Sequence, residues 1–239
     1  MGLPADLLST PPAAAQDRHD RVSAAGPRPF RWVPIRALAD THRPRLLAHL
    51  SALNEHDRYL RFGFAASDDQ IAHYVDGLDF ARDEVFGIFN RKLVLLAIAH
   101  VAFLPVGGAS AAVPAVEFGV SVLPQARGRG YGQRLFDRAV LHARNRGAGE
   151  MIIHALSENT AMLHIVRKAG AVVVRNGGEA EARLQLPPDD FASRWGEAVE
   201  ESAAELDYRW KVRAQQVDSF IDTLADARAQ VGATRPPVE

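Results

Sequence analysis

The chain has 239 residues, of which 47% are hydrophobic, so it is long enough for one domain of ordinary size with a substantial core. Its 28 basic and 29 acidic residues give a formal net charge of -1, which argues against a strongly basic nucleic-acid binder. The sequence contains no cysteine. This excludes disulfides, thiolate metal ligands and a cysteine nucleophile.

Neither the longest apolar run nor the N-terminus has the pattern of a membrane or secretion signal. The longest apolar run, over residues 93–104, is interrupted by His100 and is too short to cross a bilayer. The N-terminus lacks a basic segment followed by an apolar core, which is the pattern of a secretion signal. We therefore expect a cytoplasmic protein that binds neither membranes nor nucleic acid.

Changes in composition divide the chain into three parts, at residues 1–29, 30–187 and 188–239. The first is rich in Ala, Pro and small polar residues. It cannot bury enough apolar surface to offset the entropy of ordering, so we expect a disordered tail. The middle part has the periodic patterns of a folded domain. In the last part apolar residues recur every three or four positions, which predicts one long amphipathic helix or two shorter ones.

The first half of the middle part combines strands with two helices. Residues 30–36 predict a strand, which Pro34 places at a sheet edge. Residues 40–53 carry a stripe of leucines at helical spacing. Ser67 and Gln70 form a capping box that opens a second helix. Three further strands are predicted over 84–89, 92–104 and 115–123.

The second half alternates helices and strands after a glycine-rich turn. The pattern predicts a helix ending near Arg146, closed by Gly147, and then a strand over 150–156. Another helix begins near Asn159 and stops at Gly170. The last predicted strands are 171–175 and 180–186. The fold class is therefore α/β, in the broad sense that includes α+β.

One segment carries a pattern typical of phosphate binding. From Glu117 the sequence reads EFGVSVLPQARGRGYG, so a predicted strand runs into three alternating glycines and then into a helix. Glycines let the backbone turn tightly and approach a ligand closely. The unpaired amides of a first helical turn and the helix dipole favour an anion. Residues 124–146 also contain six arginines and one acidic residue, which predicts a basic patch for an anionic cofactor.

The two familiar nucleotide motifs match this segment poorly. A P-loop requires Lys and then Ser or Thr after its glycines, but Gly132 is followed by Gln133 and Arg134. A dinucleotide-binding fingerprint requires a glycine three positions after its second glycine, and position 133 is Gln. Neither motif therefore explains the glycines.

The segment resembles the acyl-CoA loop of the GNAT family of N-acetyltransferases, Gln/Arg-x-x-Gly-x-Gly/Ala. The loop begins at Gln125, or at Arg127 in the alternative register. The resemblance covers roughly residues 30–186 and is strongest over 117–171. The residues that carry it are Val122, Pro124, Arg127, Gly128, Gly130, Gly132, Leu135, Asn159, Met162, Lys168 and Gly170. Residues 58–62, RYLRF, resemble the branch that includes bacterial protein-lysine acetyltransferases.

The resemblance implies a twisted mixed sheet, flanked by helices, whose fourth and fifth strands splay apart around acetyl-CoA. Pantetheine would pair with the fourth strand and form a hydrogen bond with Asn159, while the pyrophosphate would lie on the loop amides. Arg127 and Arg129 would add charge to the phosphates. No metal is implied. The implied acetyl-CoA-binding residues are Ser121, Val122, Leu123, Gln125, Arg127, Gly128, Arg129, Gly130, Tyr131, Gly132 and Asn159.

The implied reaction is amide formation on an acceptor amine, either a protein lysine or a small molecule. A lysine-type amine has a pKa of about 10.4, so a base must remove a proton. The resemblance assigns this role to Glu117, whose apolar strand would desolvate the carboxylate and favour proton uptake. Val166 stands where the family often has a tyrosine. Because there is no cysteine, we expect the acetyl group to pass directly from thioester to amine in a ternary complex.

Structural alternatives stand beside these assigned roles. Glu117 is alternatively a solvated or ion-paired strand residue, and Arg127 and Arg129 are ordinary surface charges. Asn159 alternatively caps the helix that follows it.

Other polar residues favour structural interpretations. His42, His49 and His56 recur every seven residues, and a solvated helix face explains them better than a metal site. Arg58 and Arg61 favour an exposed turn over a binding site for an acidic group. His100 and His154 fall in predicted strands, so we interpret them as core or rim histidines rather than as metal ligands.

Two other functions also fit the sequence. The missing tyrosine and the C-terminal extension are compatible with a non-catalytic acyl-CoA-binding regulatory module. They are equally compatible with an interaction protein that forms a homodimer or docks a partner through its C-terminal helix. Residues 189–230 contain ten acidic and five basic residues, so this helix either attracts cationic acceptors or packs on the core.

Overall fold

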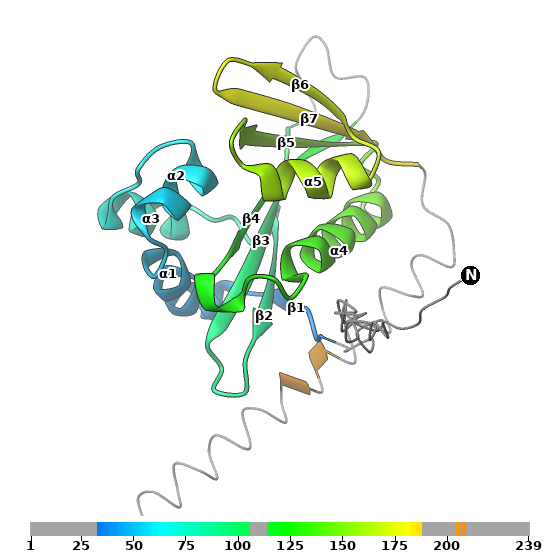
Figure 1. The fold of residues 1–239 in the computed structure, drawn as a ribbon. Helices are drawn as coiled ribbons and strands as arrows, with labels where there is room; N and C mark the ends of the chain where they lie inside the picture. Colours follow the sequence, from blue (N-terminus) through cyan, green and yellow to red (C-terminus); the bar gives the residue numbers. More distant parts are fainter. Residues whose placement is uncertain (1–32, 106–113, 188–203, 206, 209–239) are drawn as a thin grey trace, which may run out of the picture. The chain divides into compact units, whose positions relative to one another are not determined.

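A computed structural model of the chain describes residues 33–105, 114–187, 204–205 and 207–208. They form one seven-stranded sheet in the order β1-β2-β3-β4-β5-β7-β6, flanked by helices (Figure 1). All neighbouring strands are antiparallel except β4 and β5. The strands are β1 (Arg36–Leu38), β2 (Glu84–Phe89), β3 (Leu95–Phe103), β4 (Ala115–Val122), β5 (Glu150–Leu156), β6 (Val172–Asn176) and β7 (Glu179–Gln185).

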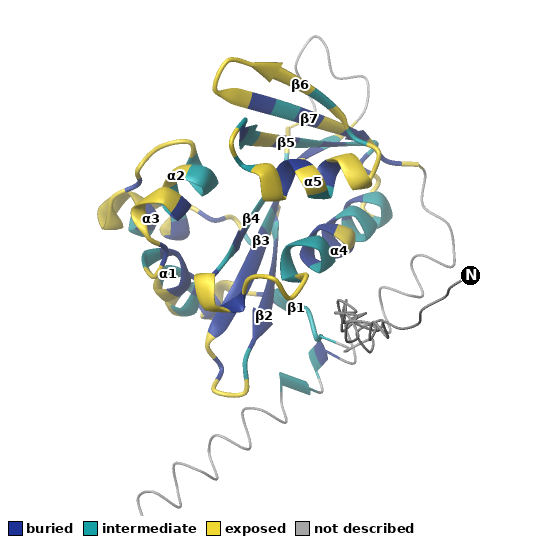
Figure 2. Cartoon of the chain, in the orientation of Figure 1, coloured by how far each residue is buried: buried dark blue, intermediate teal, exposed yellow. Residues whose placement is uncertain are grey.

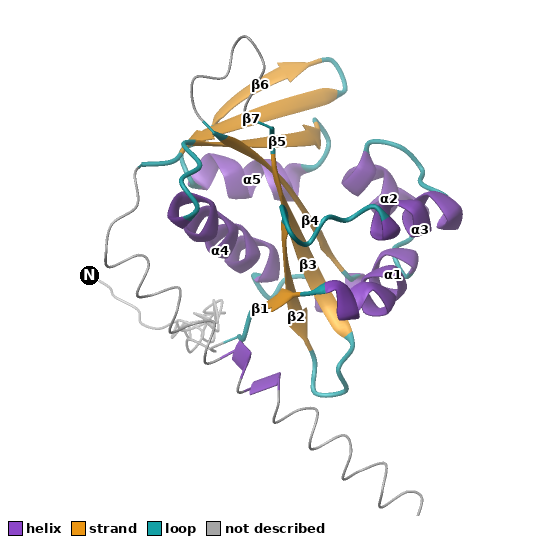
Figure 3. Ribbon diagram, turned by 180° about the vertical axis from the view of Figure 1, so that it is seen from behind, coloured by secondary structure: helices purple, strands orange, loops and turns teal. Residues whose placement is uncertain are grey.

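Helices cover both faces of the sheet, as Figures 1 and 3 show from opposite sides. The α-helices are α1 (Arg43–Ser51), α2 (Glu55–Phe62), α3 (Asp68–Asp76), α4 (Tyr131–Asn145) and α5 (Thr160–Lys168). Two short 3-10 helices, η1 (Asp40–His42) and η2 (Pro124–Ala126), precede α1 and follow β4. Helices α1–α3 lie against one face, and α4 and α5 lie against the other. This arrangement confirms the predicted mixed sheet flanked by helices.

Successive side chains of the central strands point to opposite faces of the sheet, so the domain has one hydrophobic core on each face. On β3, Ala97, Ala99 and Val101 belong to the core under α4 and α5, whereas Ile98 belongs to the core under α1 and α3. Figure 2 shows β2 and β3 as largely buried and much of β6 as exposed. A strand covered on both sides is apolar on both sides, which explains the long apolar run of β3.

Local side-chain signals explain where the helices begin and end. The capping box predicted at Ser67 and Gln70 is present at the start of α3. Helix α2 was missing from the sequence prediction, although its signals are present. The Asn54 side chain accepts a hydrogen bond from the Asp57 amide, and Gly63 ends the helix in the left-handed region with φ of 82°.

Several predicted strand boundaries were wrong. Strand β1 begins at Arg36, after Pro34, which has no amide hydrogen to donate to the ladder. Strand β3 begins at Leu95 rather than residue 92, because the Asn90 side chain accepts the amides of Lys92 and Val94 and closes a wider turn. Strand β6 lies one residue later than predicted and strand β7 one residue earlier, so the turn between them is shorter.

The predicted tail at 1–29 and most of the predicted extension at 188–239 lie outside the described residues. Four residues of the extension are described, and they pack on the domain. The Tyr208 ring lies 5.3 Å from the Phe89 ring and 3.6 Å from the Arg36 Cζ atom. Glu205 forms an ion pair with Arg36 at 3.1 Å. These contacts favour core packing for this part of the extension. Within the described ranges, no helix has both the length and the hydropathy needed to span a membrane.

Candidate active site

Strands β4 and β5 separate after a short parallel pairing. The pairing runs from Ala115 opposite Glu150 to Glu117 opposite Ile152, and no pair follows among the described residues (Figure 1). Beyond Glu117 the two strands diverge, and β5 pairs with β7 on its other side over its whole length. The split that the resemblance implied between these two strands is therefore present, and Glu117 lies where it opens.

Hydrogen-bond direction shows which β4 residues face this split. The Ala115 carbonyl accepts the Leu104 amide and the Leu123 amide donates to Leu96, so the odd-numbered residues of β4 are directed toward β3. Because directions alternate along a strand, the even-numbered residues direct their amides and carbonyls toward the split. Of the three predicted pairing residues, Val122 faces the split and Ser121 and Leu123 do not. The sequence prediction omitted Phe118 and Val120, which also face it.

The glycine-rich segment between β4 and α4 adopts backbone conformations that require glycine. Gly128 and Gly130 have φ of 72° and 74°, and a Cβ on either would meet no atom within 4 Å. Both positions are therefore exposed to a ligand that approaches the backbone. Gly132 serves packing instead, because its Cβ would lie 3.3 Å from Ile165 of α5. Tyr131, directly after the N-cap Gly130, begins the fifteen-residue helix α4.

The arginines of this segment have protein partners. Arg127 forms an ion pair with Asp57 of α2 at 2.5 Å and donates from Nε to the Val122 carbonyl at 3.3 Å. Arg129 donates to the carbonyl of Gln125 at 3.4 Å. Further along, Arg138 is buried and lies over the Phe86 ring. Part of the basic character of residues 124–146 thus serves packing rather than a phosphate site.

Asn159 lies at the other side of the split, after β5. Its side-chain oxygen accepts the Met162 amide at 3.1 Å and so caps α5. Asn159 therefore does cap the helix that follows it, as the structural alternative predicted. Asn159 also lines the cavity described below, which leaves the predicted second role compatible with its position.

A cavity of about 820 Å³ opens on the α1–α3 side of the split. It lies between Arg61 on α2, Glu117 and Gly119 on β4, and His154 on β5. Its volume is within the range of small-molecule sites. The Glu117 side chain is exposed to this space, so the desolvation expected from its apolar strand is absent. The reason is its position at the end of the pairing with β5, where no helix covers it.

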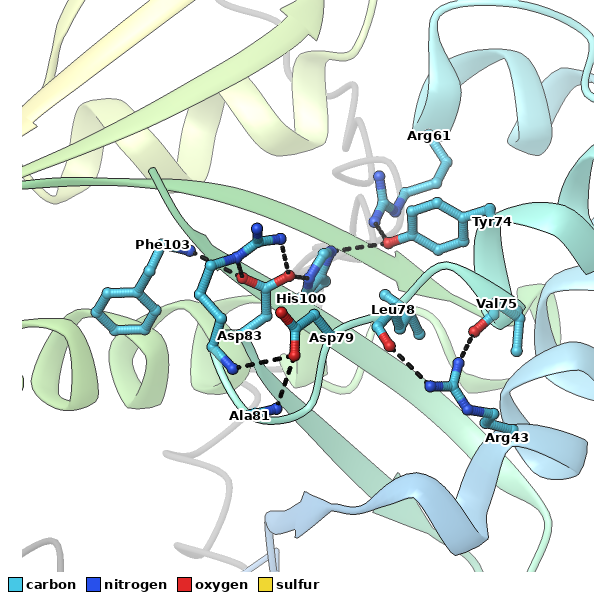
Figure 4. Close-up of polar contacts among 11 residues, drawn as sticks. Arg43, Arg61, Tyr74, Val75, Leu78, Asp79, Ala81, Asp83, His100 and Phe103 are labelled. Carbon is cyan, nitrogen blue, oxygen red and sulfur yellow. Dashed lines mark hydrogen bonds and ion pairs between the residues drawn. The ribbon is translucent and has the colours of Figure 1, made fainter. Parts of the chain in front are cut away.

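A chain of four hydrogen-bonded side chains extends from the cavity into the domain (Figure 4). Arg61 Nη2 donates to the Tyr74 hydroxyl at 3.0 Å, and the hydroxyl lies 2.9 Å from His100 Nδ1. On the other side of the ring, His100 Nε2 lies 3.3 Å from the Asp83 carboxylate. Sequence reasoning missed this chain, because its members come from α2, α3, β3 and the residue directly before β2.

The protonation of this chain follows from its surroundings. Burial, together with the nearby Arg61 charge, lowers the pKa of His100, so the ring is neutral at pH 7. Burial raises the pKa of Asp83, but hydrogen bonds from Arg82, the Phe103 amide and His100 outweigh it and hold the pKa below its usual value. Neutral His100 thus donates from Nε2 to Asp83 and accepts the Tyr74 hydroxyl hydrogen at Nδ1.

The three histidines spaced by seven do not form one solvated face. His42 and His49 are buried, and only His56 is exposed. His49 lies between the Leu95 carbonyl at 2.8 Å and the Ser121 hydroxyl at 2.9 Å. Within the described part of the chain, no group of three His, Asp or Glu is placed to hold a metal ion.

Arg58 and Arg61 lie in helix α2 rather than in an exposed turn. Arg58 donates to the carbonyls of Ser51, Leu53 and Ala66 and forms an ion pair with Asp68 at 2.7 Å. It therefore ties α1, α2 and α3 together, whereas Arg61 reaches the cavity.

The acetyltransferase (GNAT) family model matches residues 53–171, about half of the chain, and this range includes Arg61, Glu117 and the glycine-rich segment. The chain belongs to the GNAT acetyltransferase family. It is accordingly an acetyltransferase, and acetyl-CoA is the donor that this family uses. No curated protein matches the sequence.

Solved structures of GNAT acetyltransferases have the same fold. The GNAT domain of PAT from S. lividans is 20% identical with a TM-score of 0.54, over 64% of this chain and 89% of that chain. An N-acetyltransferase from Staphylococcus aureus Mu50 is 16% identical with a TM-score of 0.52, and the match covers 66% of this chain and 100% of that chain. YncA, a putative acetyltransferase from Salmonella typhimurium solved with its cofactor acetyl-CoA, is 16% identical with a TM-score of 0.51, over 67% and 97%.

This GNAT domain departs from the family pattern at Val166. Val166 is fully buried in the core under α5, so it offers no proton donor. His164, two residues earlier, is exposed on α5 and is absent from the cavity lining. Of the titratable side chains on α5, none lines the cavity.

Proposed function

We propose that this GNAT acetyltransferase transfers the acetyl group of acetyl-CoA directly to an amine, in a ternary complex. The observation that carries this proposal is the split between β4 and β5, with Glu117 at the point where it opens. A donor bound along the split would bring its thioester toward the cavity that Glu117 lines.

The residues on the donor side fit acetyl-CoA. Phe118, Val120 and Val122 direct backbone groups into the split, where an amide-containing pantetheine arm would pair with them as an added strand does. Gly128 and Gly130 expose backbone at the start of α4, where a helix N-terminus favours the pyrophosphate. Ser121 acts structurally in this proposal, through its hydrogen bond to His49.

Glu117 acts as the general base. The acceptor arrives mostly as an ammonium ion, and the exposed carboxylate of Glu117 takes one proton from it, directly or through one water. The nitrogen lone pair then attacks the thioester carbonyl carbon, the C–N bond forms, and the C–S bond breaks. The amide nitrogen releases its remaining extra proton to water. The leaving thiolate has an ordinary pKa near 8.5, so water can protonate it without a dedicated acid at position 166.

Direct transfer also follows from composition. The sequence has no cysteine, so an acyl-cysteine intermediate is excluded. In this proposal donor and acceptor occupy the site together, so initial-rate kinetics should give intersecting rather than parallel lines.

Substitution of Glu117 by Gln tests the assignment. We expect kcat to fall about 100- to 10,000-fold while acetyl-CoA binding is retained, because only proton transfer is lost. The matched control is Glu179→Gln, an exposed glutamate on β7 that lines the same cavity. Unchanged turnover in Glu117→Gln would remove this residue from the mechanism. Acetyl-CoA binding without turnover by the wild type would favour the regulatory-module alternative.

A further inference from the structure

We propose that Arg61 binds an anionic group of the acceptor, and that the acceptor is a small amine with a carboxylate beside its amino group, such as a free α-amino acid. This inference rests on the proposed acetyltransferase function and names the substrate class of the same site. It starts from the charge and the hydrogen bonding of Arg61.

Arg61 is a partly buried cation without an acidic partner among the described residues. Its one hydrogen bond goes to the neutral Tyr74 hydroxyl, and its Nε is buried with no partner there. Arg58, one turn earlier on the same helix, instead has three carbonyl acceptors and the Asp68 carboxylate. Removing a guanidinium from water without pairing it with an anion costs free energy, so the position of Arg61 suits an anionic ligand.

Among the described residues, no carboxylate hydrogen-bonds to Arg61 or forms an ion pair with it. Tyr74 is held by neutral His100, and the Asp83 carboxylate lies at the far end of that chain, beyond the imidazole ring. His49, also near Arg61, is buried and neutral. The chain therefore fixes the direction of Arg61 without neutralising it, which makes Tyr74, His100 and Asp83 positioning residues.

Glycine at position 119 allows the guanidinium to lie against β4. A Cβ built on Gly119 would lie 2.7 Å from Arg61 Cζ, so any other residue there would displace the arginine. Gly119 and Glu117 share one face of the strand, two residues apart, which corresponds to ~7 Å. Arg61, which lies against Gly119, is thus about 7 Å from the proposed base Glu117.

This spacing selects a class of acceptor. An α-amino acid presents its ammonium to Glu117 and its carboxylate to Arg61, because the two groups are on neighbouring atoms. Arg61 forms paired hydrogen bonds with a carboxylate through its planar fork. A lysine side chain in a protein has no carboxylate next to its amine and would leave Arg61 unpaired.

Matched acceptors test the inference. Free L-amino acids are compared with the corresponding amino acid amides, with thiol release from acetyl-CoA as readout. We expect kcat/KM to be about 10- to 100-fold higher for the acids. The preference cannot arise from amine basicity, because the amide has the less basic amine and more of it is unprotonated at neutral pH. Equal or better use of the amides, or turnover with lysine peptides alone, would overturn the proposal.

Substitutions at the site separate Arg61 from general effects. Arg61→Gln should lower the acid-to-amide ratio of kcat/KM about 10- to 100-fold, mainly through the KM of the acid. Tyr74→Phe keeps the ring and removes the hydroxyl, so it should lower the same ratio by a smaller factor. Arg91→Gln, in the exposed β2–β3 turn, is the control and should leave the ratio unchanged. If Arg61→Gln reduces kcat/KM equally for acid and amide, Arg61 does not bind the carboxylate.

A binding measurement distinguishes this inference from the proposed function. Calorimetric titration of the CoA-bound wild type with the same acids and amides requires no turnover. Binding of the acids alone, weakened in Arg61→Gln, supports the inference even if catalysis fails. Binding of neither series, in a protein that binds CoA, contradicts it.

Discussion

An ion pair between Asp57 and Arg127, with Oδ1 and Nη2 2.5 Å apart, ties α2 to the glycine-rich segment. The Asp57 side chain is only 6% exposed, whereas Arg127 is half exposed. A phosphate that bound Arg127 would have to compete with a nearly buried carboxylate. The structure thus gives Arg127 a role that the family resemblance alone does not indicate.

Arg127→Gln should therefore lower stability more than it lowers cofactor affinity. The loss leaves the Asp57 carboxylate buried without a counter-charge, at an expected cost of about 1–3 kcal/mol in the free energy of unfolding. The double variant Asp57→Asn/Arg127→Gln should recover part of this loss, because the unpaired charge is gone. Urea unfolding of Arg127→Gln, Asp57→Asn and the double variant gives the coupling energy, and strictly additive effects would contradict the pairing.

A second prediction separates backbone strain from phosphate binding in the glycine-rich segment. Gly130→Ala and Gly147→Ala place a side chain at similar backbone angles, with φ of 74° and 82°. Each should cost about 1–2 kcal/mol of stability, as left-handed conformations do for residues other than glycine. Only Gly130 lies at the N-terminus of α4, as its N-cap, so only Gly130→Ala should also weaken acetyl-CoA binding.

Calorimetric titration with acetyl-CoA checks this, with Gly147→Ala as the strain-matched control. Gly147 follows the last turn of α4, at the opposite end of the helix from the proposed phosphate site. Equal affinity in the two variants would mean that the backbone of Gly130 does not contact the cofactor.

The sequence predicts what depends on short-range patterns. Strands β2 and β5 have the predicted bounds, because each has a regular apolar pattern between polar ends. The glycines at 128 and 130 also lie where their spacing indicates, since left-handed backbone is a local property. Helix α2 was missed because its eight residues carry only a short apolar pattern, and its caps at Asn54 and Gly63 are single-residue signals.

The candidate site is predicted only in part, because tertiary contacts decide the rest. Glu117 and the glycine-rich segment could be located, since they belong to one continuous motif. Arg61, Tyr74 and His100 come from three separate elements, and no spacing relates them. Likewise, the burial of His49 depends on Ser121, which is far away in the sequence and close only in the fold.

A third prediction concerns the part of the C-terminal extension that packs on the domain. Tyr208→Ala should lower the free energy of unfolding by about 1–3 kcal/mol, because its ring contacts Phe89, His42 and the Arg36 guanidinium. Tyr208→Phe keeps the ring in place and should lose much less. Thermal unfolding of the two variants checks this, and equal melting temperatures for the wild type and Tyr208→Ala would contradict the packing.

A buried histidine makes stability depend on pH in a defined direction. Burial, aided by the Arg61 charge and opposed by the hydrogen bond to Leu95, lowers the pKa of His49 from 6.5 to about 4. Between these values the unfolded chain binds a proton at His49 and the folded chain does not. The contribution of His49 is therefore fully present above about pH 6.5 and is lost as the pH falls toward 4, by about 3 kcal/mol in total.

His49→Gln should flatten this dependence. The variant is less stable at pH 7, because it disturbs the hydrogen bonds to Leu95 and Ser121, but it should lose less additional stability between pH 7 and pH 4.5 than the wild type. His42 and His100 also have lowered pKa values and contribute in the same direction, so the difference between the two proteins is the relevant quantity. Urea unfolding across this range measures it, with exposed His164→Gln as the control. Parallel curves for the wild type and His49→Gln would show that His49 does not remain neutral in the folded protein.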